Sequence, residues 1–197
     1  MFTTNFIRIL YCVPQDMLHL HNKFLEDLRS YFPHLEVIGG LPKSNEINDD
    51  LLPKLVIMDD LMSEMFRDPL MTDLFTRLSR HNSVSLVFTT QNYFDSGNSK
   101  TIVRQCNVQV IFENPMDKVL TRSIGSAIVP KQPDFLNNCF DSLRHFFPLE
   151  KFPYILIDGN ANKNMKGIMF RSHVFPDFSN EIKPICFFVN PQYIKKR

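Results

Sequence analysis

The sequence predicts an α/β fold in three layers, a mostly parallel sheet with helices covering both of its faces. Short apolar runs alternate with amphipathic segments between residues 6 and 115, which is typical of parallel strands joined by crossover helices. The run LVIM at 55–58 is apolar at every position, as expected of a strand buried on both faces. Neither a repeat nor a long linker interrupts the chain, so we expect a single domain over 1–197.

Proline, glycine and polar turns bound the expected strands of the first half of the chain. Between these strands, apolar residues recur at helical spacing. We expect Asp16 to cap the first helix and Asp68 to cap the second, where Pro69 suits the first turn. Residues 43–50 are polar and are expected to form a connection without secondary structure. Strands are predicted over 6–13, 34–42, 54–60 and 84–92, and helices over 15–32 and 68–81.

The second half of the chain adds one more helix and strand to this alternation, and after that strand the alternation stops. A helical pair follows the strand, and the last predicted unit is a β-hairpin with a long polar loop. A helix is predicted over 99–106, a strand over 107–115, two helices over 116–129 and 133–147, and the hairpin over 152–173.

Composition and net charge bear on which classes of protein the chain can belong to. Hydrophobic residues make up 44% and charged residues 22%, which is typical of globular proteins. The net charge of +1 gives no overall attraction to nucleic acid, so DNA binding would need a local patch. No apolar run reaches the ~18 residues that cross a membrane. The four cysteines form no close pair, which predicts buried thiols in a reducing intracellular compartment rather than a zinc site.

Two adjacent aspartates, Asp59 and Asp60, end the buried strand. Such residues often form a turn that caps the next helix. They also match a Walker B element, in which the first carboxylate binds the Mg²⁺ of a nucleoside triphosphate and the second orients or deprotonates the attacking water. The next strand ends in TTQN at 89–92, where Gln91 could contact a γ-phosphate or that water. Two such strand ends, one helix apart, favour the nucleotide site over the turn.

The chain resembles the DNA-packaging ATPases of Polinton/Maverick elements and related double-stranded DNA viruses, which belong to the FtsK–HerA division of P-loop NTPases. The resemblance extends from about residue 9 to about residue 178, and its most specific parts contain the patterns FTR, TQN and NP.DK. It is carried by LVIMDDLMSE (55–64), LFTRLSRHNSVSLVFTTQNYF (74–94), SKTIVRQCNVQVIFENPMDK (99–118) and PYILIDG (153–159).

This resemblance implies a RecA/FtsK-like core that couples hydrolysis of Mg²⁺–ATP to translocation of double-stranded DNA into a capsid. Asp59 would be the Mg²⁺ ligand and Asp60 the catalytic carboxylate. Gln91 would be the sensor of the γ-phosphate, with Asn92 beside it at the nucleotide. Arg77 would act in trans as an arginine finger. The implied partners are DNA, capsid components and other copies of the chain in a homo-oligomeric ring. The implied location is the nucleus, a viral factory or the virion.

The chain departs from this family at two places. After FTR, it lacks the glycine and the second arginine that the family carries there. More importantly, no GxxxxGK[ST] loop occurs in the 197 residues, although this loop binds the β- and γ-phosphates. We therefore expect an N-terminally truncated fragment or a decayed copy that is inactive as an ATPase by itself. A sheet without the strand that carries the loop should expose apolar edges beside LVIMD and SLVFTT.

Two other functions stay open. The chain could be a non-enzymatic module that binds DNA or capsid components and keeps only the scaffold of such an ATPase. It could instead be a nuclease, because paired carboxylates also hold metals for phosphodiester cleavage. A nuclease would need further acidic ligands to converge on Asp59 and Asp60, and Glu113 and Asp158, at other strand ends, are the candidates. No partner is evident for His173.

Overall fold

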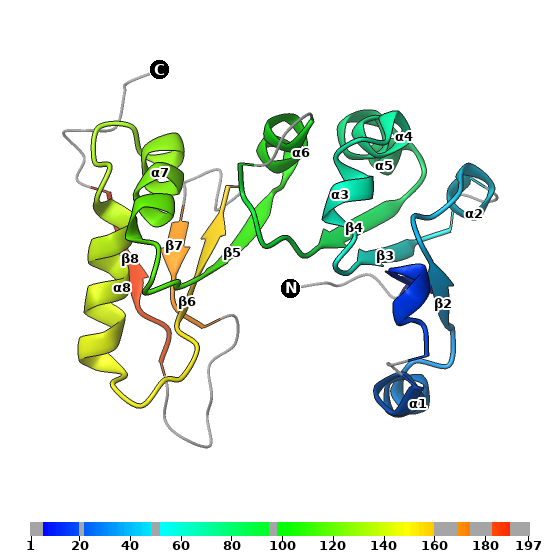
Figure 1. Cartoon of the computed structure of the whole chain (residues 1–197), viewed down its shortest axis with the longest axis horizontal. Helices are drawn as coiled ribbons and strands as arrows, with labels where there is room; N and C mark the ends of the chain where they lie inside the picture. Colours follow the sequence, from blue (N-terminus) through cyan, green and yellow to red (C-terminus); the bar gives the residue numbers. More distant parts are fainter. Residues whose placement is uncertain are drawn as a thin grey trace. The chain divides into compact units, whose positions relative to one another are not determined.

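The described residues form two compact units, one within residues 1–105 and the other within residues 106–197. The structure is a computed structural model that describes residues 6–19, 22–48, 52–94, 98–159, 169–173 and 183–189 (Figure 1). Each unit contains one four-stranded sheet. The single domain expected over 1–197 stays a prediction.

The sheet of the first unit is entirely parallel, with the strand order β2-β1-β3-β4. This arrangement confirms the predicted α/β class for this part of the chain. In the register, Tyr11 lies opposite Ile57, and Met58 lies opposite Phe88. The strands are β1 (Arg8–Val13), β2 (Leu35–Gly39), β3 (Lys54–Met58) and β4 (Val84–Phe88).

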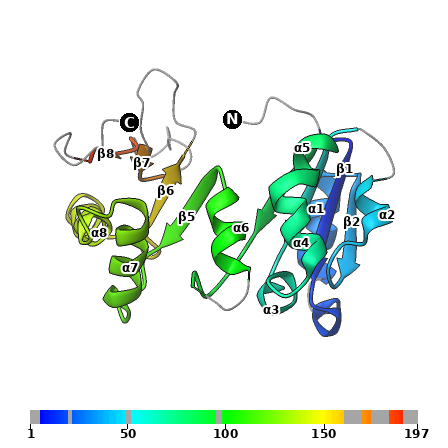
Figure 2. The same ribbon diagram turned by 90° about the horizontal axis from the view of Figure 1, so that it is seen from above.

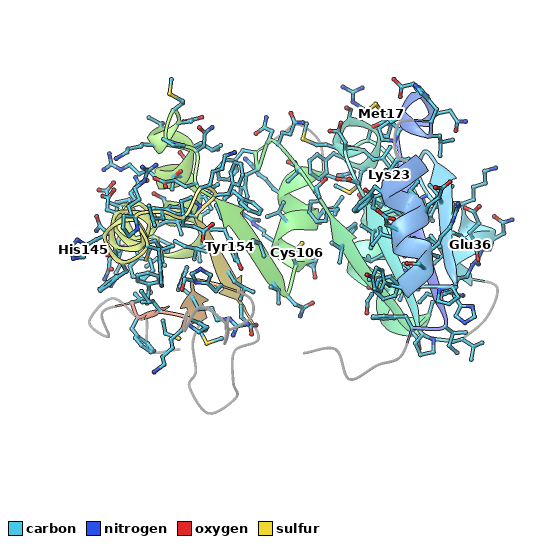
Figure 3. All side chains as sticks on the ribbon, turned by 90° about the horizontal axis from the view of Figure 1, so that it is seen from below. Met17, Lys23, Glu36, Cys106, His145 and Tyr154 are labelled. Carbon is cyan, nitrogen blue, oxygen red and sulfur yellow. The ribbon has the colours of Figure 1, made fainter. Side chains whose placement is uncertain are left out.

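Helices cover both faces of the parallel sheet. On one face, α1 (Asn22–Tyr31) packs Leu25 against Ile9, Tyr11 and Val13 (Figure 3, where α1 carries the labelled Lys23). The other face lies under the segments that join β2, β3 and β4 (Figure 2). These segments are α2 (Ser44–Asn48), α3 (Met62–Met65), α4 (Pro69–Asp73), η2 (Leu74–Leu78) and α5 (Ser79–His81), and α6 (Ser99–Gln105) follows β4.

Three helical segments differ in detail from the prediction. The helix expected over 15–32 is divided into the 3₁₀ turn η1 (Gln15–Met17) and α1, and Asp16 lies inside η1 rather than capping it. Residues 43–50, expected to be a connection, contain α2, whose first turn is closed by Glu46 accepting a hydrogen bond from the Lys43 amide (2.6 Å). The helix at 68–81 begins as predicted, with the Asp68 side chain accepting from the Leu70 amide, but its middle is the π-helical η2.

The second unit has an antiparallel sheet with the order β5-β6-β7-β8. Residues 107–115 were expected to continue the parallel sheet, and that prediction was wrong, because β5 pairs antiparallel with β6. The pairing of β6 with β7 confirms the predicted hairpin, whose polar loop at 160–168 lies outside the described residues. The strands are β5 (Val108–Phe112), β6 (Tyr154–Asp158), β7 (Met169–Arg171) and β8 (Cys186–Phe187).

The predicted helical pair, α7 (Lys118–Ile128) and α8 (Phe135–Phe146), packs together beside this antiparallel sheet (Figure 1). Phe135 of α8 contacts Phe170 of β7, with ring centroids 4.9 Å apart. Asp117 caps α7 by accepting a hydrogen bond from the Leu120 amide (2.8 Å), so the NP.D turn has a structural role. Among the described helices, none has both the length and the apolar character that crossing a bilayer would require.

The parallel sheet ends at β4, which pairs with β3 and with no other strand among the described residues. This confirms the open edge expected beside SLVFTT. The edge expected beside LVIMD is not found, because β3 lies between β1 and β4. The β4 segment VSLVF carries no charge and no proline, and Val87 is 42% exposed.

Candidate functional site

The candidate site lies at the carboxyl edge of the parallel sheet, where Asp59 and Asp60 directly follow β3. In the order β2-β1-β3-β4, the chain leaves β1 toward one side of the sheet and leaves β3 toward the other. Ligands of open parallel sheets usually bind at such a switch point, outside the carboxyl ends of the two strands. The topology therefore places the two aspartates at the position where a site is expected.

Both carboxylate oxygens of Asp59 accept hydrogen bonds from hydroxyl groups of neighbouring strands. The Tyr11 hydroxyl, from β1, donates to Oδ2 at 2.6 Å. The Thr89 hydroxyl, from the residue after β4, donates to Oδ1 at 2.7 Å. The main chain is fixed as well, because the Asp59 amide donates to the carbonyl of Cys12 (2.9 Å). The half-buried Asp59 carboxylate is thus tied to the strands on both sides of β3.

The Thr89 hydroxyl also links the two aspartates. It accepts a hydrogen bond from the Asp60 amide (3.1 Å) while it donates to Asp59. Asp60 has a φ of 55°, in the left-handed region that aspartate tolerates better than most residues. This backbone conformation turns the chain away from the β3 direction and leaves the Asp60 side chain exposed.

Gln91 lies beside Asp60, as the sequence predicts for the ends of adjacent parallel strands. Its side-chain amide donates to Asp60 Oδ1 over 3.4 Å, a long and weak hydrogen bond between two exposed groups. Asn92 has a local role instead, because its Oδ1 accepts from the Phe94 amide (3.1 Å). This Asx-type contact stabilises the turn after β4.

Arg77, proposed from the resemblance as a trans-acting finger, lies in η2. Its guanidinium donates to Asp73 Oδ2 at 2.7 Å, one helical turn earlier, and its side chain is 63% exposed. Within the described part of the chain, the contacts of Arg77 do not include either site aspartate. Asp59, Asp60 and Gln91 are therefore brought together, and Arg77 is not.

The environment of Tyr11 keeps its hydroxyl a hydrogen-bond donor. Burial, followed by the hydrogen bond and charge of Asp59, raises the pKa of Tyr11 well above its ordinary value. The phenol is therefore neutral throughout the physiological range and offers its proton to Asp59. Sequence reasoning missed this residue, since a tyrosine in an apolar strand reads as part of the core.

The residues of the site fit Mg²⁺. This ion takes oxygen ligands and binds proteins through one or two carboxylates, with water or phosphate oxygens completing its shell. Each oxygen of Asp59 accepts one hydroxyl, which leaves lone pairs free for a cation. The exposed Asp60 adds a second carboxylate. Asp59 would hold the ion, which would neutralise phosphate charge when bound.

The two candidates for additional nuclease ligands, Glu113 and Asp158, lie in the second unit. Glu113 is engaged there by Arg144, whose Nε donates to both carboxylate oxygens at 2.8 and 3.0 Å. Its side chain is only 6% exposed. Asp158 lies in β6. Across the described ranges, no three or more His, Cys, Asp or Glu side chains gather as a metal site would require.

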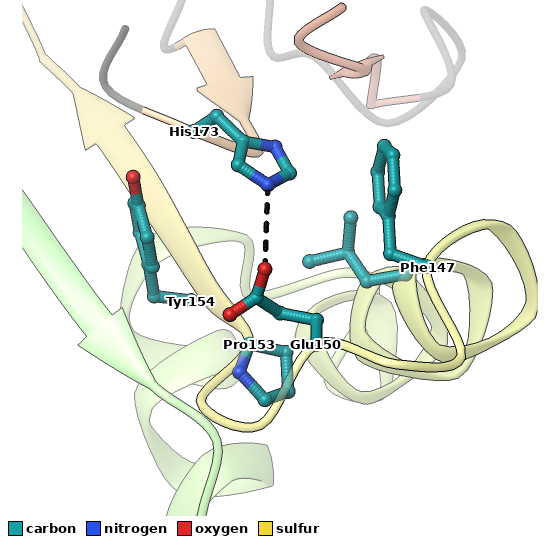
Figure 4. Close-up of a pocket in the computed structure, with 6 residues that line it drawn as sticks. Phe147, Glu150, Pro153, Tyr154 and His173 are labelled. Carbon is teal, nitrogen blue, oxygen red and sulfur yellow. Dashed lines mark ion pairs between the residues drawn. The ribbon is translucent and has the colours of Figure 1, made fainter. Parts of the chain in front are cut away.

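A second polar cluster surrounds His173, for which the sequence suggested no partner. Its Nε2 lies 3.8 Å from Glu150 Oε2, and its Nδ1 lies 3.0 Å from the Ser172 hydroxyl. The rings of Phe147 and Tyr154 pack edge-on against it (Figure 4). Phe147, Glu150, Tyr154 and His173 line a small pocket together with Leu143 and Pro153. The cluster joins the end of β7 to the segment between α8 and β6.

Comparison with known proteins gives no identification. The chain matches no protein-family model, no curated protein and no solved structure.

Proposed function

We propose that the chain carries part of the site of a Mg²⁺-dependent nucleoside triphosphatase, namely the residues that bind the metal ion and activate the attacking water. The observation that carries the proposal is the arrangement at the carboxyl edge of the parallel sheet. Asp59 is fixed there by hydroxyls from both neighbouring strands, and Asp60 and Gln91 lie next to each other beside it.

The side chains divide the chemistry among them. The half-buried, fixed Asp59 would hold the metal ion against phosphate oxygens. The exposed Asp60 has no strong hydrogen bond of its own side chain in the described contacts, so it is free to orient or deprotonate water. Gln91 can donate to the γ-phosphate or to that water, since its hydrogen bond to Asp60 is long and weak.

We further propose a RecA/FtsK-like core belonging to a DNA-packaging motor. The resemblance of LVIMDD and FTTQN to the packaging ATPases supports this assignment. The open edge of β4 supports it too, because one more parallel strand could pair there and deliver a phosphate-binding loop next to Asp59 and Gln91. Double-stranded DNA, capsid components and further copies in a ring would then be the partners, with Arg77 exposed for a neighbouring subunit.

A second candidate is a scaffold that binds DNA or capsid components without hydrolysis. The absence of GxxxxGK[ST] from the 197 residues favours it. In this case Asp59 and Asp60 would be remnants of a site, and their carboxylates would hold no metal.

Binding of Mn²⁺, a paramagnetic substitute for Mg²⁺, distinguishes the two candidates. The 197-residue chain is titrated with Mn²⁺, and free Mn²⁺ is measured by electron paramagnetic resonance. We expect binding that Asp59→Asn weakens by about tenfold or more, because a direct ligand is lost. Asp73→Asn, which alters an exposed carboxylate at the end of α4, is the control and should bind Mn²⁺ as the wild type does. Equal Mn²⁺ affinity of wild type and Asp59→Asn would overturn the nucleotide-site proposal in favour of the scaffold.

A further inference from the structure

We infer that Tyr11 is a positioning residue of the acidic site and that it acts together with Thr89 on the carboxylate of Asp59. The inference rests on the proposed function, because it assigns to these two hydroxyls the task of presenting Asp59 to a divalent cation. Neither residue was assigned a role from the sequence.

Tyr11 is anchored in the core and reaches the site with its hydroxyl alone. The residue is only 8% exposed, and its side chain belongs to the cluster formed by β1, β2 and α1. Its ring packs edge-on against Phe24 of α1, with centroids 6.5 Å apart. A ring held in this way can move little, so the hydroxyl 2.6 Å from Asp59 Oδ2 is a fixed donor.

Thr89 holds the other carboxylate oxygen of Asp59, from the side of β4. Its amide donates to the carbonyl of Met58 (3.0 Å), which continues the pairing of β4 with β3 past the end of the strand. Its hydroxyl donates its one hydrogen to Asp59 and accepts a hydrogen bond from the Asp60 amide. This geometry fixes the direction of the hydroxyl proton toward Asp59 Oδ1.

Two donors on two different oxygens, one from each neighbouring strand, fix the position of the carboxylate and so hold the Asp59 side chain in one rotamer. The remaining lone pairs of Asp59 then point in set directions before any cation arrives. Outer groups that orient a metal ligand in this way typically account for about tenfold to hundredfold in metal affinity. A merely structural tyrosine would satisfy its buried hydroxyl on Asp59 without any effect on cation binding.

The test compares variants that remove one hydroxyl while keeping shape. Tyr11→Phe keeps the ring against Phe24, and Thr89→Val keeps the branched side chain. Thr89→Ser restores a hydroxyl, and Tyr31→Phe, at a position 77% exposed on α1, is the matched control. Mn²⁺ affinity is measured by electron paramagnetic resonance. Independently, three-bond NMR couplings to the Asp59 carboxyl carbon in the metal-free chain report whether its side chain stays in one rotamer.

We expect Tyr11→Phe and Thr89→Val each to weaken Mn²⁺ binding by about tenfold or more and to average the Asp59 couplings. Thr89→Ser and Tyr31→Phe should match the wild type. If Asp59→Asn abolishes Mn²⁺ binding but Tyr11→Phe leaves it unchanged, the positioning role is wrong and the proposed function stands. If no Mn²⁺ binding depends on Asp59, the proposed function fails, and the positioning role for a cation fails with it, whatever the couplings show.

Discussion

Gly125→Ala is a sharp test of the helix packing in the second unit, because two effects of known sign oppose each other. Gly125 is buried in α7 and faces the start of α8. A methyl group there would lie 2.7 Å from the carbonyl oxygen of Pro133 and 3.3 Å from Leu136 Cβ. The first contact is with main chain, and Leu136 is fully buried, so neither neighbour can yield without moving α8.

The magnitudes favour destabilisation. Replacing glycine by alanine inside a helix stabilises it by about 1 kcal/mol. Forcing a methyl group into a filled contact costs about 1–3 kcal/mol. We therefore expect a net loss of about 1 kcal/mol in the free energy of unfolding. Ala127→Gly, at an exposed position in the last turn of the same helix, reports the propensity effect without the close contact and should cost less than the ~1 kcal/mol of a helix interior.

Urea denaturation followed by circular dichroism measures these differences. Hydrogen exchange of the α7 and α8 amides assigns them to the second unit, since each unit could open by itself. A gain of about 1 kcal/mol for Gly125→Ala, the value that helix propensity alone would give, would refute the close packing of α7 on the Pro133 carbonyl.

Three further predictions concern the first unit. In a form of the protein that contains a phosphate-binding loop, Asp60→Asn should abolish ATP hydrolysis while ATP still binds; phosphate release and calorimetry measure the two, and unchanged turnover would remove Asp60 from catalysis. Because burial and Asp59 raise the pKa of Tyr11 above its unfolded value near 10, the neutral phenol stabilises the fold fully below that pH, and this contribution is lost as the pH rises through the folded-state pKa. Alkaline pH should therefore lower the urea midpoint of the wild type more than that of Tyr11→Phe, and parallel pH profiles would contradict this. Asp68→Ala should cost about 1 kcal/mol through loss of the cap on Leu70, whereas an unchanged urea midpoint would show that this cap is not needed.

The fold was predictable where the apolar pattern was unambiguous. LVIM at 55–58 is apolar on both faces, and β3 is indeed an inner strand of a parallel sheet. VQVIF at 108–112 contains one polar residue, Gln109, and it lies on the less exposed face, whereas Val108, Val110 and Phe112 are exposed. The apolar pattern of this strand therefore did not distinguish an antiparallel from a parallel partner. The short helix α2 has one fully buried apolar residue, Ile47, too few to show a helical period.

Only the site residues that directly follow predicted strands could be predicted from the sequence. Asp59, Asp60 and Gln91 follow adjacent parallel strands, so their proximity follows from topology. The contribution of Tyr11 depends on the register of β1 against β3, which places it opposite Ile57 and two positions before Asp59. Register comes from packing across the whole sheet and cannot be derived from one strand. The contact between His173 and Glu150 likewise joins segments whose approach no local pattern reveals.

The left-handed backbone at Asp60 has an evolutionary consequence. At a φ of 55°, Asp, Asn and Gly are accommodated far better than branched or bulky residues, so drift at this position is confined to a small set of substitutions. Under the proposed function, lineages that still hydrolyse nucleotide should retain Asp, and lineages that keep only the scaffold should accumulate Asn or Gly. Divergent copies of this chain can therefore be sorted by the codon at position 60.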